Sequence, residues 1–186
     1  MAKLFIGALA LIMLYLLVSW LMINFVHGYV LFINRGQGLR TISENAAASN
    51  NLLAVYRFAH GINGLLLIAI VASLPDVHGH SIVILLALGS VIFEWAQAAV
   101  PYRGKLMHIH TALAFAMAVS MVSLAWVLQL SVELPYTEFL VARLSGALAI
   151  LLFGYFWHPP RPYSWVVQML VINLVYVQIA VTLATT

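Results

Sequence analysis

The chain of 186 residues is 65% hydrophobic and only 7% charged, whereas an average soluble domain is about 45–50% apolar and about 25% charged. Because its apolar runs lack the polar stripe of a surface helix, a water-soluble globule is excluded and lipid must be the solvent. The formal net charge of +3 arises from 8 scattered Lys and Arg residues, a pattern that favours membrane orientation over binding to nucleic acid. The chain contains no cysteine, which excludes disulfides, thiolate metal sites and a cysteine nucleophile.

Apolar runs of about 20 residues predict an all-α fold, a polytopic transmembrane bundle of about six helices in one domain, residues 1–186. We expect the spans at 4–31, 52–74, 81–100, 108–130, 138–157 and 164–185. The first run resembles a signal peptide, but it is long enough to span and its Ala8-x-Ala10 triplet comes early for a cleavage site. We therefore expect it to be retained. Prolines at 75, 101, 135 and 159–162 separate the runs, because proline interrupts the helical hydrogen-bond ladder.

The longest connection is predicted between the first two spans, at residues 32–51. It contains Thr41-Ile-Ser-Glu44, a capping-box pattern in which the Thr hydroxyl and the Glu carboxylate bind free amides at a helix start. This pattern predicts a short interfacial helix. Ser49, with Asn50 and Asn51, is placed to cap the second span.

An even number of spans places both termini at one face of the membrane, here named end X, and the opposite face is named end Y. Most basic residues fall near end Y, namely Arg35, Arg40, Arg57, Arg103, Lys105 and Arg161. End X has only Lys3 and Arg143. Because basic residues beside short loops are retained in the cytoplasm, we expect end Y to be cytoplasmic and the termini outside, in a prokaryotic cytoplasmic membrane. Arginines gathered by a binding site would bias the same count.

Ionisable residues also lie inside the predicted spans near end Y. Arg57 and His60 fall one to two turns inside the second span, Glu94 about two turns inside the third, and His110 at the start of the fourth. A charged side chain in the bilayer costs at least about 2.5–3.5 kcal/mol, so we expect Glu94 and Arg57 to face the bundle interior or water. The expected partner of Glu94 is Arg57 or a histidine of the neighbouring span.

Helical spacing adds further side chains to this polar layer. Gln97 shares a face of the third span with Glu94, and the first span contributes His27. His108 and His110 are two residues apart and therefore point in different directions if both are helical. An alternative without chemistry is a buried network that only fixes helix register, with His108 and His110 solvated at the interface.

Three polar segments occur in a recognisable order along the chain: Thr41-Ile-Ser-Glu44, Tyr56-Arg57-Phe58, and Val100-Pro101-Tyr102 followed by His108 and His110. This order resembles an uncharacterised family of six-helix prokaryotic membrane proteins, classed as a domain of unknown function and distantly similar to the eukaryotic Frag, DRAM and Sfk membrane proteins. Arg103 stands near the place of that family's aspartate. The resemblance implies a lipid-facing bundle whose first and third connections meet at one membrane face to handle lipid headgroups.

The polar layer is compatible with binding or processing of a lipid-like substrate. In this hypothesis Arg57 and Arg103 hold an anionic group, with His108 and Gln97 as further substrate-binding residues. Proton transfer falls to three candidate catalytic residues, Glu94, His60 and His110.

Two other hypotheses remain open at the level of sequence. In one, His60 pairs with His110 or His27 to ligate a b-type haem or a metal such as zinc, as in a membrane redox protein. In the other, the chain is a non-catalytic accessory subunit of a larger membrane complex or a homo-oligomer, and its polar layer only fixes packing.

Overall fold

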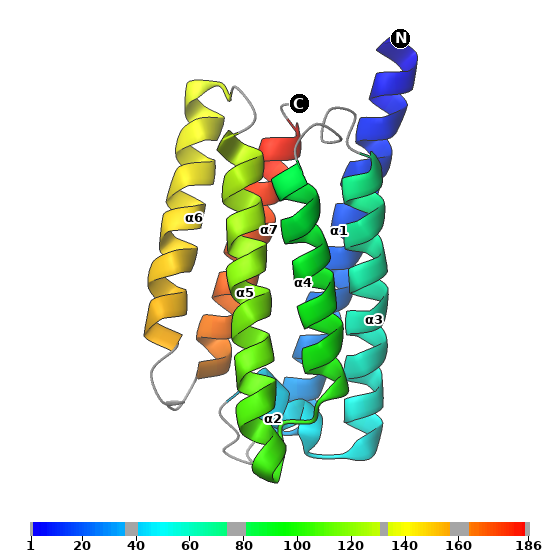
Figure 1. Ribbon diagram of the computed structural model, residues 1–186, viewed down its shortest axis with the longest axis vertical. Coiled ribbons are helices and arrows are strands. Elements are labelled where there is room, and N and C mark those ends of the chain that lie inside the picture. Colours follow the sequence, from blue (N-terminus) through cyan, green and yellow to red (C-terminus); the bar gives the residue numbers. More distant parts are fainter. Residues whose placement is uncertain (1, 36–40, 74–80, 131–133, 157–163, 185–186) are drawn as a thin grey trace.

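The computed structural model describes residues 2–35, 41–73, 81–130, 134–156 and 164–184. These residues form an all-α bundle (Figure 1), and 6 of its helices are long and apolar enough to cross a membrane. The helices are α1 (Ala2–Ile33), α2 (Ile42–Ala47), α3 (Asn50–Ser73), α4 (Ser81–Ala99), α5 (Met107–Leu130), α6 (Tyr136–Phe156) and α7 (Ser164–Ala184), with a short 3₁₀ turn, η2 (Gly104–Leu106), before α5. The predicted fold class is confirmed, and every predicted span overlaps an observed helix.

The lipid-facing surface explains why the apolar runs lack a polar stripe. Large apolar side chains point outward from several helices, and Phe25, Phe58 and Leu85 are 74%, 70% and 67% exposed. Such side chains are stable in hydrocarbon and would aggregate in water. The interior also holds apolar side chains, such as Val83 and Leu124, together with buried polar residues, including Ser90.

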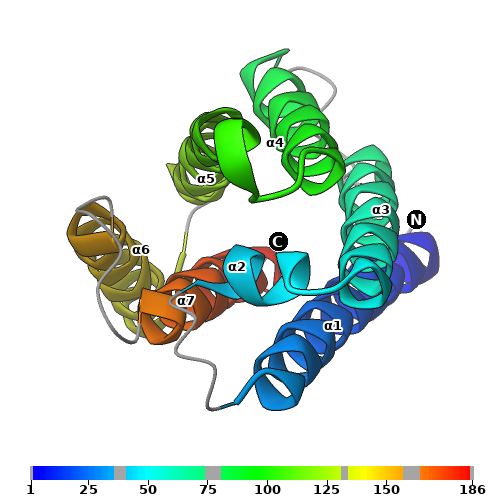
Figure 2. The same cartoon turned by 90° about the horizontal axis from the view of Figure 1, so that it is seen from below.

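The short helix α2 forms as the capping-box pattern predicts. The Thr41 hydroxyl accepts a hydrogen bond from the Glu44 amide, and the Glu44 carboxylate accepts one from the Thr41 amide, both at 3.0 Å. Ser49 caps α3, because its hydroxyl accepts from the Leu52 amide at 3.2 Å. Viewed from end Y, α2 lies across the end of the bundle (Figure 2).

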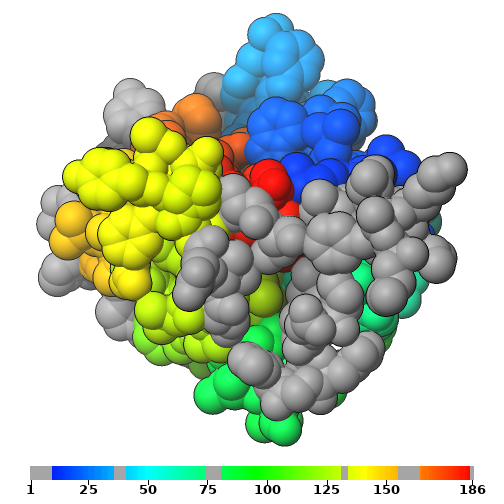
Figure 3. All heavy atoms as spheres, turned by 90° about the horizontal axis from the view of Figure 1, so that it is seen from above, coloured from blue at the N-terminus to red at the C-terminus, as the bar shows by residue number. Residues whose placement is uncertain are grey.

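The spanning helices pack in two groups that position the site. α1, α3, α4 and α5 pack side by side in that order, and α6 packs mainly against α7. α7 also contacts α1 and α5 and so joins the two groups. The start of α1 and the end of α7 lie at the same end of the bundle (Figure 1), as six spans require. On that face the end of α7 lies between the atoms of α6 and those of α1 (Figure 3).

Candidate functional site

The buried carboxylate Glu94 is bound by α3. The His60 Nδ1 and Glu94 Oε1 atoms are 2.9 Å apart, and the Asn63 amide nitrogen donates to the same oxygen at 2.6 Å. His60 and Asn63 are three residues apart and therefore share one face of α3, while Glu94 and both partners are 3–5% exposed. The prediction that a histidine pairs with Glu94 is confirmed.

The alternative partner, Arg57, does not pair with Glu94. Arg57 is exposed, and its guanidinium donates to the carbonyl oxygens of Ala98 and Ala99 at 3.0 and 2.6 Å. These carbonyls belong to the last turn of α4, where helical partners are missing and the helix dipole favours a cation. Arg57 thus caps α4 without the cost of burial.

Arg103 plays a similar part at the end of α2. Its guanidinium donates to the carbonyl oxygen of Ala47 at 2.6 Å and to the Asn50 side chain at 3.3 Å. The start of α2 is held from α7, because the Ile42 amide donates to the Gln168 side chain at 2.9 Å. These contacts fix α2 over the bundle end.

Further polar groups bind Asn63, which itself binds Glu94. The Asn63 side-chain oxygen accepts hydrogen bonds from the hydroxyls of Ser19 on α1 and Tyr176 on α7, the latter at 3.1 Å. The network around Glu94 therefore joins four spans. The sequence reasoning missed Ser19 and Asn63; the available signal for Asn63 was its position three residues after His60.

His27 extends the chain of hydrogen bonds away from Glu94. Its Nε2 lies 3.3 Å from His60 Nε2, which gives a continuous row of Glu94, His60 and His27. His27 is 3% exposed, and its second ring nitrogen, Nδ1, has no hydrogen-bond partner in the described part of the chain. An unpaired buried polar group is costly and calls for an explanation.

His110 is buried and fully engaged, whereas His108 is exposed. The His110 Nδ1 lies 2.6 Å from the carbonyl oxygen of Val100, and its Nε2 lies 2.9 Å from the Ser43 hydroxyl. His110 thus joins α5 to α2 and to the end of α4. The two histidines differ in burial as their spacing predicts, although both line the same cavity.

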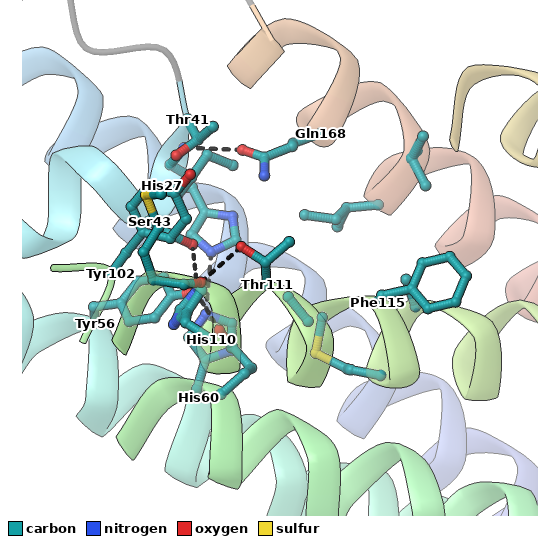
Figure 4. A pocket seen from close by; sticks show the side chains of 18 of the residues that line it. His27, Thr41, Ser43, Tyr56, His60, Tyr102, His110, Thr111, Phe115 and Gln168 are labelled. Atoms are coloured by element: carbon teal, nitrogen blue, oxygen red, sulfur yellow. Dashed lines mark hydrogen bonds between the residues drawn. The ribbon is translucent and has the colours of Figure 1, made fainter. Parts of the chain in front are cut away.

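A cavity of about 340 Å³ opens beside the histidines (Figure 4). Its polar lining comes from His27, Thr41, Ser43, Tyr56, His60, Gln97, Tyr102, His108, His110, Thr111 and Gln168. Its apolar lining comes from Ile42, Met107, Ala114, Phe115, Met117, Ala118, Phe153, Val171 and Ile172. The labelled polar side chains gather at one side of Figure 4 and Phe115 lies at the other. The cavity therefore has a polar and an apolar end.

Not all predicted site residues reach this cavity. His27, His60, Gln97, His108 and His110 line it. Glu94 lies behind His60, and Arg57 and Arg103 hold the helix ends described above. Among the described residues, the cavity lining includes no Asp, Glu, Lys or Arg.

The histidine geometry differs from that of a haem or zinc centre. His27 and His60 hydrogen-bond through their Nε2 atoms at 3.3 Å, whereas axial ligands must stand on opposite faces of a macrocycle. Both ring nitrogens of His110 already have protein partners. Within the described ranges, no three His, Cys, Asp or Glu residues are grouped to hold a metal ion. The hydrogen bonds instead make a buried row of side chains that ends beside a cavity.

Comparison with known proteins adds no further constraint. No protein-family model, no curated protein and no solved structure matches the chain. The resemblance noted from the three polar segments therefore stays a prediction. What is established is a multi-pass bundle with a buried polar network and an adjoining cavity at end Y.

Proposed function

We propose that this integral membrane protein binds a lipid-like amphiphile in the cavity at end Y. The head of the molecule lies beside His27 and Gln97, and its apolar chain runs between α5 and the α6–α7 pair. The observation that carries this proposal is the division of one cavity into a polar and an apolar end.

The size and lining of the cavity support an organic occupant. Its volume of about 340 Å³ lies within the range of about 300–1,000 Å³ that is usual for ligand sites. Two polar atoms of its lining residues, His27 Nδ1 and Gln97 Nε2, are buried without a partner in the described residues. A bound head group would satisfy them, and so would ordered water.

The apolar end of the cavity lies where the bundle is least tightly joined. Phe115 of α5 and Phe153 of α6 stack there with ring centroids 5.4 Å apart, and both are half-buried. α5 and α6 otherwise make few contacts. An alkyl chain from the surrounding membrane would meet apolar side chains along this route and lose no hydrogen bonds.

Filling the cavity tests the proposal. Ala114→Phe places a large side chain in the lining, and Ala112→Phe places the same side chain at an exposed position of the same helix. We expect wild-type protein and the Ala112→Phe control to retain a stoichiometric amphiphile after purification, measured by extraction and mass spectrometry. Ala114→Phe should retain much less at unchanged helicity. Equal retention by all three proteins would contradict the proposal, and copurifying partner chains in their place would favour the accessory-subunit hypothesis.

We also propose that end Y faces the cytoplasm of a prokaryotic cell. Of the described basic residues, only Lys3 and Arg143 lie toward end X, which follows the positive-inside pattern. Because the chain has no cysteine, single cysteines can report the orientation. Ser49→Cys at end Y should be protected from a membrane-impermeant maleimide in intact cells, and Thr137→Cys at end X should be labelled. The reverse pattern would invert the assignment.

A further inference from the structure

We infer that the head of the bound amphiphile is an uncharged hydrogen-bond acceptor of the carbonyl type, such as an ester, held by His27 and Gln97. The inference rests on the proposed function and names the substrate class of the same cavity. It follows from how protons are distributed along Glu94, His60 and His27.

The first step concerns the charge of the buried pair. Glu94 and His60 form a hydrogen-bonded acid–base pair, and both side chains are almost completely buried. An unneutralised carboxylate inside a bilayer is costly. The pair therefore has a net charge of zero. Either His60 is protonated and Glu94 is ionised, or His60 is a neutral imidazole and Glu94 is a protonated carboxyl group, and the proton that distinguishes these two states is here called the additional proton.

The second step fixes the donor between the histidines. If the additional proton is on His60, the imidazolium donates from Nδ1 to Glu94 and from Nε2 to His27. If the proton is on Glu94, the carboxyl group donates to His60 Nδ1, and the neutral ring again carries its hydrogen on Nε2. In both cases His60 donates, and His27 Nε2 accepts.

The third step gives the polarity of the cavity wall. A neutral imidazole that accepts at Nε2 carries its hydrogen on Nδ1, so the unpartnered atom of His27 is a donor. Gln97 provides a second one, because Tyr56 donates to its side-chain oxygen at 3.1 Å and the amide nitrogen has no partner in the described residues. Two residues that line one end of the cavity therefore each hold a buried donor without an acceptor among the described residues.

These donors define the chemistry of the head. A carbonyl oxygen has two lone pairs and can accept from such donors, whereas a group that only donates would leave them unpaired. An ionised head lacks a counter-charge, because none of the described lining residues is Lys, Arg, Asp or Glu. The site therefore matches an ester-type head with an alkyl chain.

Direct observation of the histidine tautomers provides one test. In protein labelled with ¹⁵N-histidine and held in lipid nanodiscs, long-range ¹H–¹⁵N correlation spectra should show His27 with hydrogen on Nδ1. Glu94→Gln keeps the shape but removes the additional proton. The amide oxygen, held by the donor of Asn63, also faces His60 Nδ1, so neutral His60 then donates from Nδ1 and His27 from Nε2. We expect this substitution to switch the His27 tautomer. The inference would be overturned if wild-type His27 carried its hydrogen on Nε2, or if the His27 tautomer were the same in wild-type and Glu94→Gln protein.

Competition between matched probes provides the second test. Native mass spectrometry would follow an equimolar mixture of methyl laurate, dodecyl methyl ether, which lacks the carbonyl group, and laurate, which is charged. We expect wild-type protein to retain the ester about tenfold more than either competitor. Gln97→Leu and His27→Phe should each reduce this preference while all alkyl chains still bind.

The outcomes separate the two proposals. Equal retention of ester and ether by wild-type protein, with both lost in Ala114→Phe, would overturn the inference and leave amphiphile binding intact. Preference for laurate would also overturn it and would favour the anionic head first expected from the arginines. Wild-type retention of every probe no higher than that of Ala114→Phe would refute the proposed function itself.

Discussion

Replacing Glu94 by leucine tests whether the buried network contributes to stability. The substitution keeps a similar volume but removes the acceptor that binds both His60 and Asn63. Interhelical hydrogen bonds in membrane proteins contribute on average about 0.6 and at most about 1.7 kcal/mol each. The loss of two predicts a decrease of about 1–3 kcal/mol in the free energy of unfolding. Burial of the leucine side chain does not compensate for this loss of free energy, because in the unfolded state the same side chain lies in lipid, which is as apolar as the protein interior.

Steric trapping in mixed micelles or bicelles would measure this free energy directly. Glu94→Gln retains an acceptor oxygen for both donors and should cost less than Glu94→Leu. Glu138→Leu at the start of α6 is the matched control, because the Glu138 carboxylate accepts a hydrogen bond from the adjacent Thr137 of the same helix, and it should have little effect. If Glu94→Leu leaves the protein as stable as wild type, the network does not hold the helices together. The presence of these buried polar residues would then have to be explained by ligand binding alone.

Three further substitutions test local features of the fold. Gly146→Ala would place a methyl carbon 2.7 Å from the fully buried Gln178 amide and should cost about 1–3 kcal/mol in unfolding free energy, whereas Gly154→Ala meets nothing within 4 Å and should be neutral. Thr41→Ala removes the capping box of α2 and should cost about 1 kcal/mol, seen as faster amide exchange confined to α2. Arg57→Lys cannot reproduce the two-carbonyl contact and should loosen the end of α4, detected as increased exchange of its last turn.

The spans were predictable because one physical quantity, the thickness of hydrocarbon, sets their length. Each predicted boundary falls within 2 residues of an observed helix end, as comparison of 52–74 with Asn50–Ser73 illustrates. The capping box of α2 was predictable for a different reason. It is a local pattern whose four residues contain both donors and both acceptors.

The different surroundings of Arg57 and His60 show what depth along a helix leaves undetermined. Arg57 and His60 lie within one turn of each other on α3, but one is exposed and the other is buried. Sequence position gave their height in the membrane, whereas the rotation of α3 decided which side chain met Glu94. The free carbonyls of α4 then offered Arg57 a partner at the surface, and no periodicity in α3 could indicate them.

The contact between His27 and His60 was likewise beyond the sequence pattern. Both residues were placed near end Y, and both were candidates for metal binding. Their direct hydrogen bond depends on how closely α1 approaches α3, which in turn depends on small differences in packing. The same approach brings Ser19 to Asn63. The orientation of the network therefore became visible only with the helices in place.

The two packing groups of the bundle have different roles in the proposed site. α1, α3 and α4 are joined by interhelical hydrogen bonds near Glu94, and with no water in the bilayer core to replace them, these helices have a fixed register. α5 and α7 are joined instead toward end X, where Gln178 donates to Gln129 at 2.9 Å. Toward end Y apolar side chains of α5 and α7 face the cavity, and separating apolar side chains in lipid costs little. A rigid half can thus recognise the head of a ligand, while a more compliant half admits its chain.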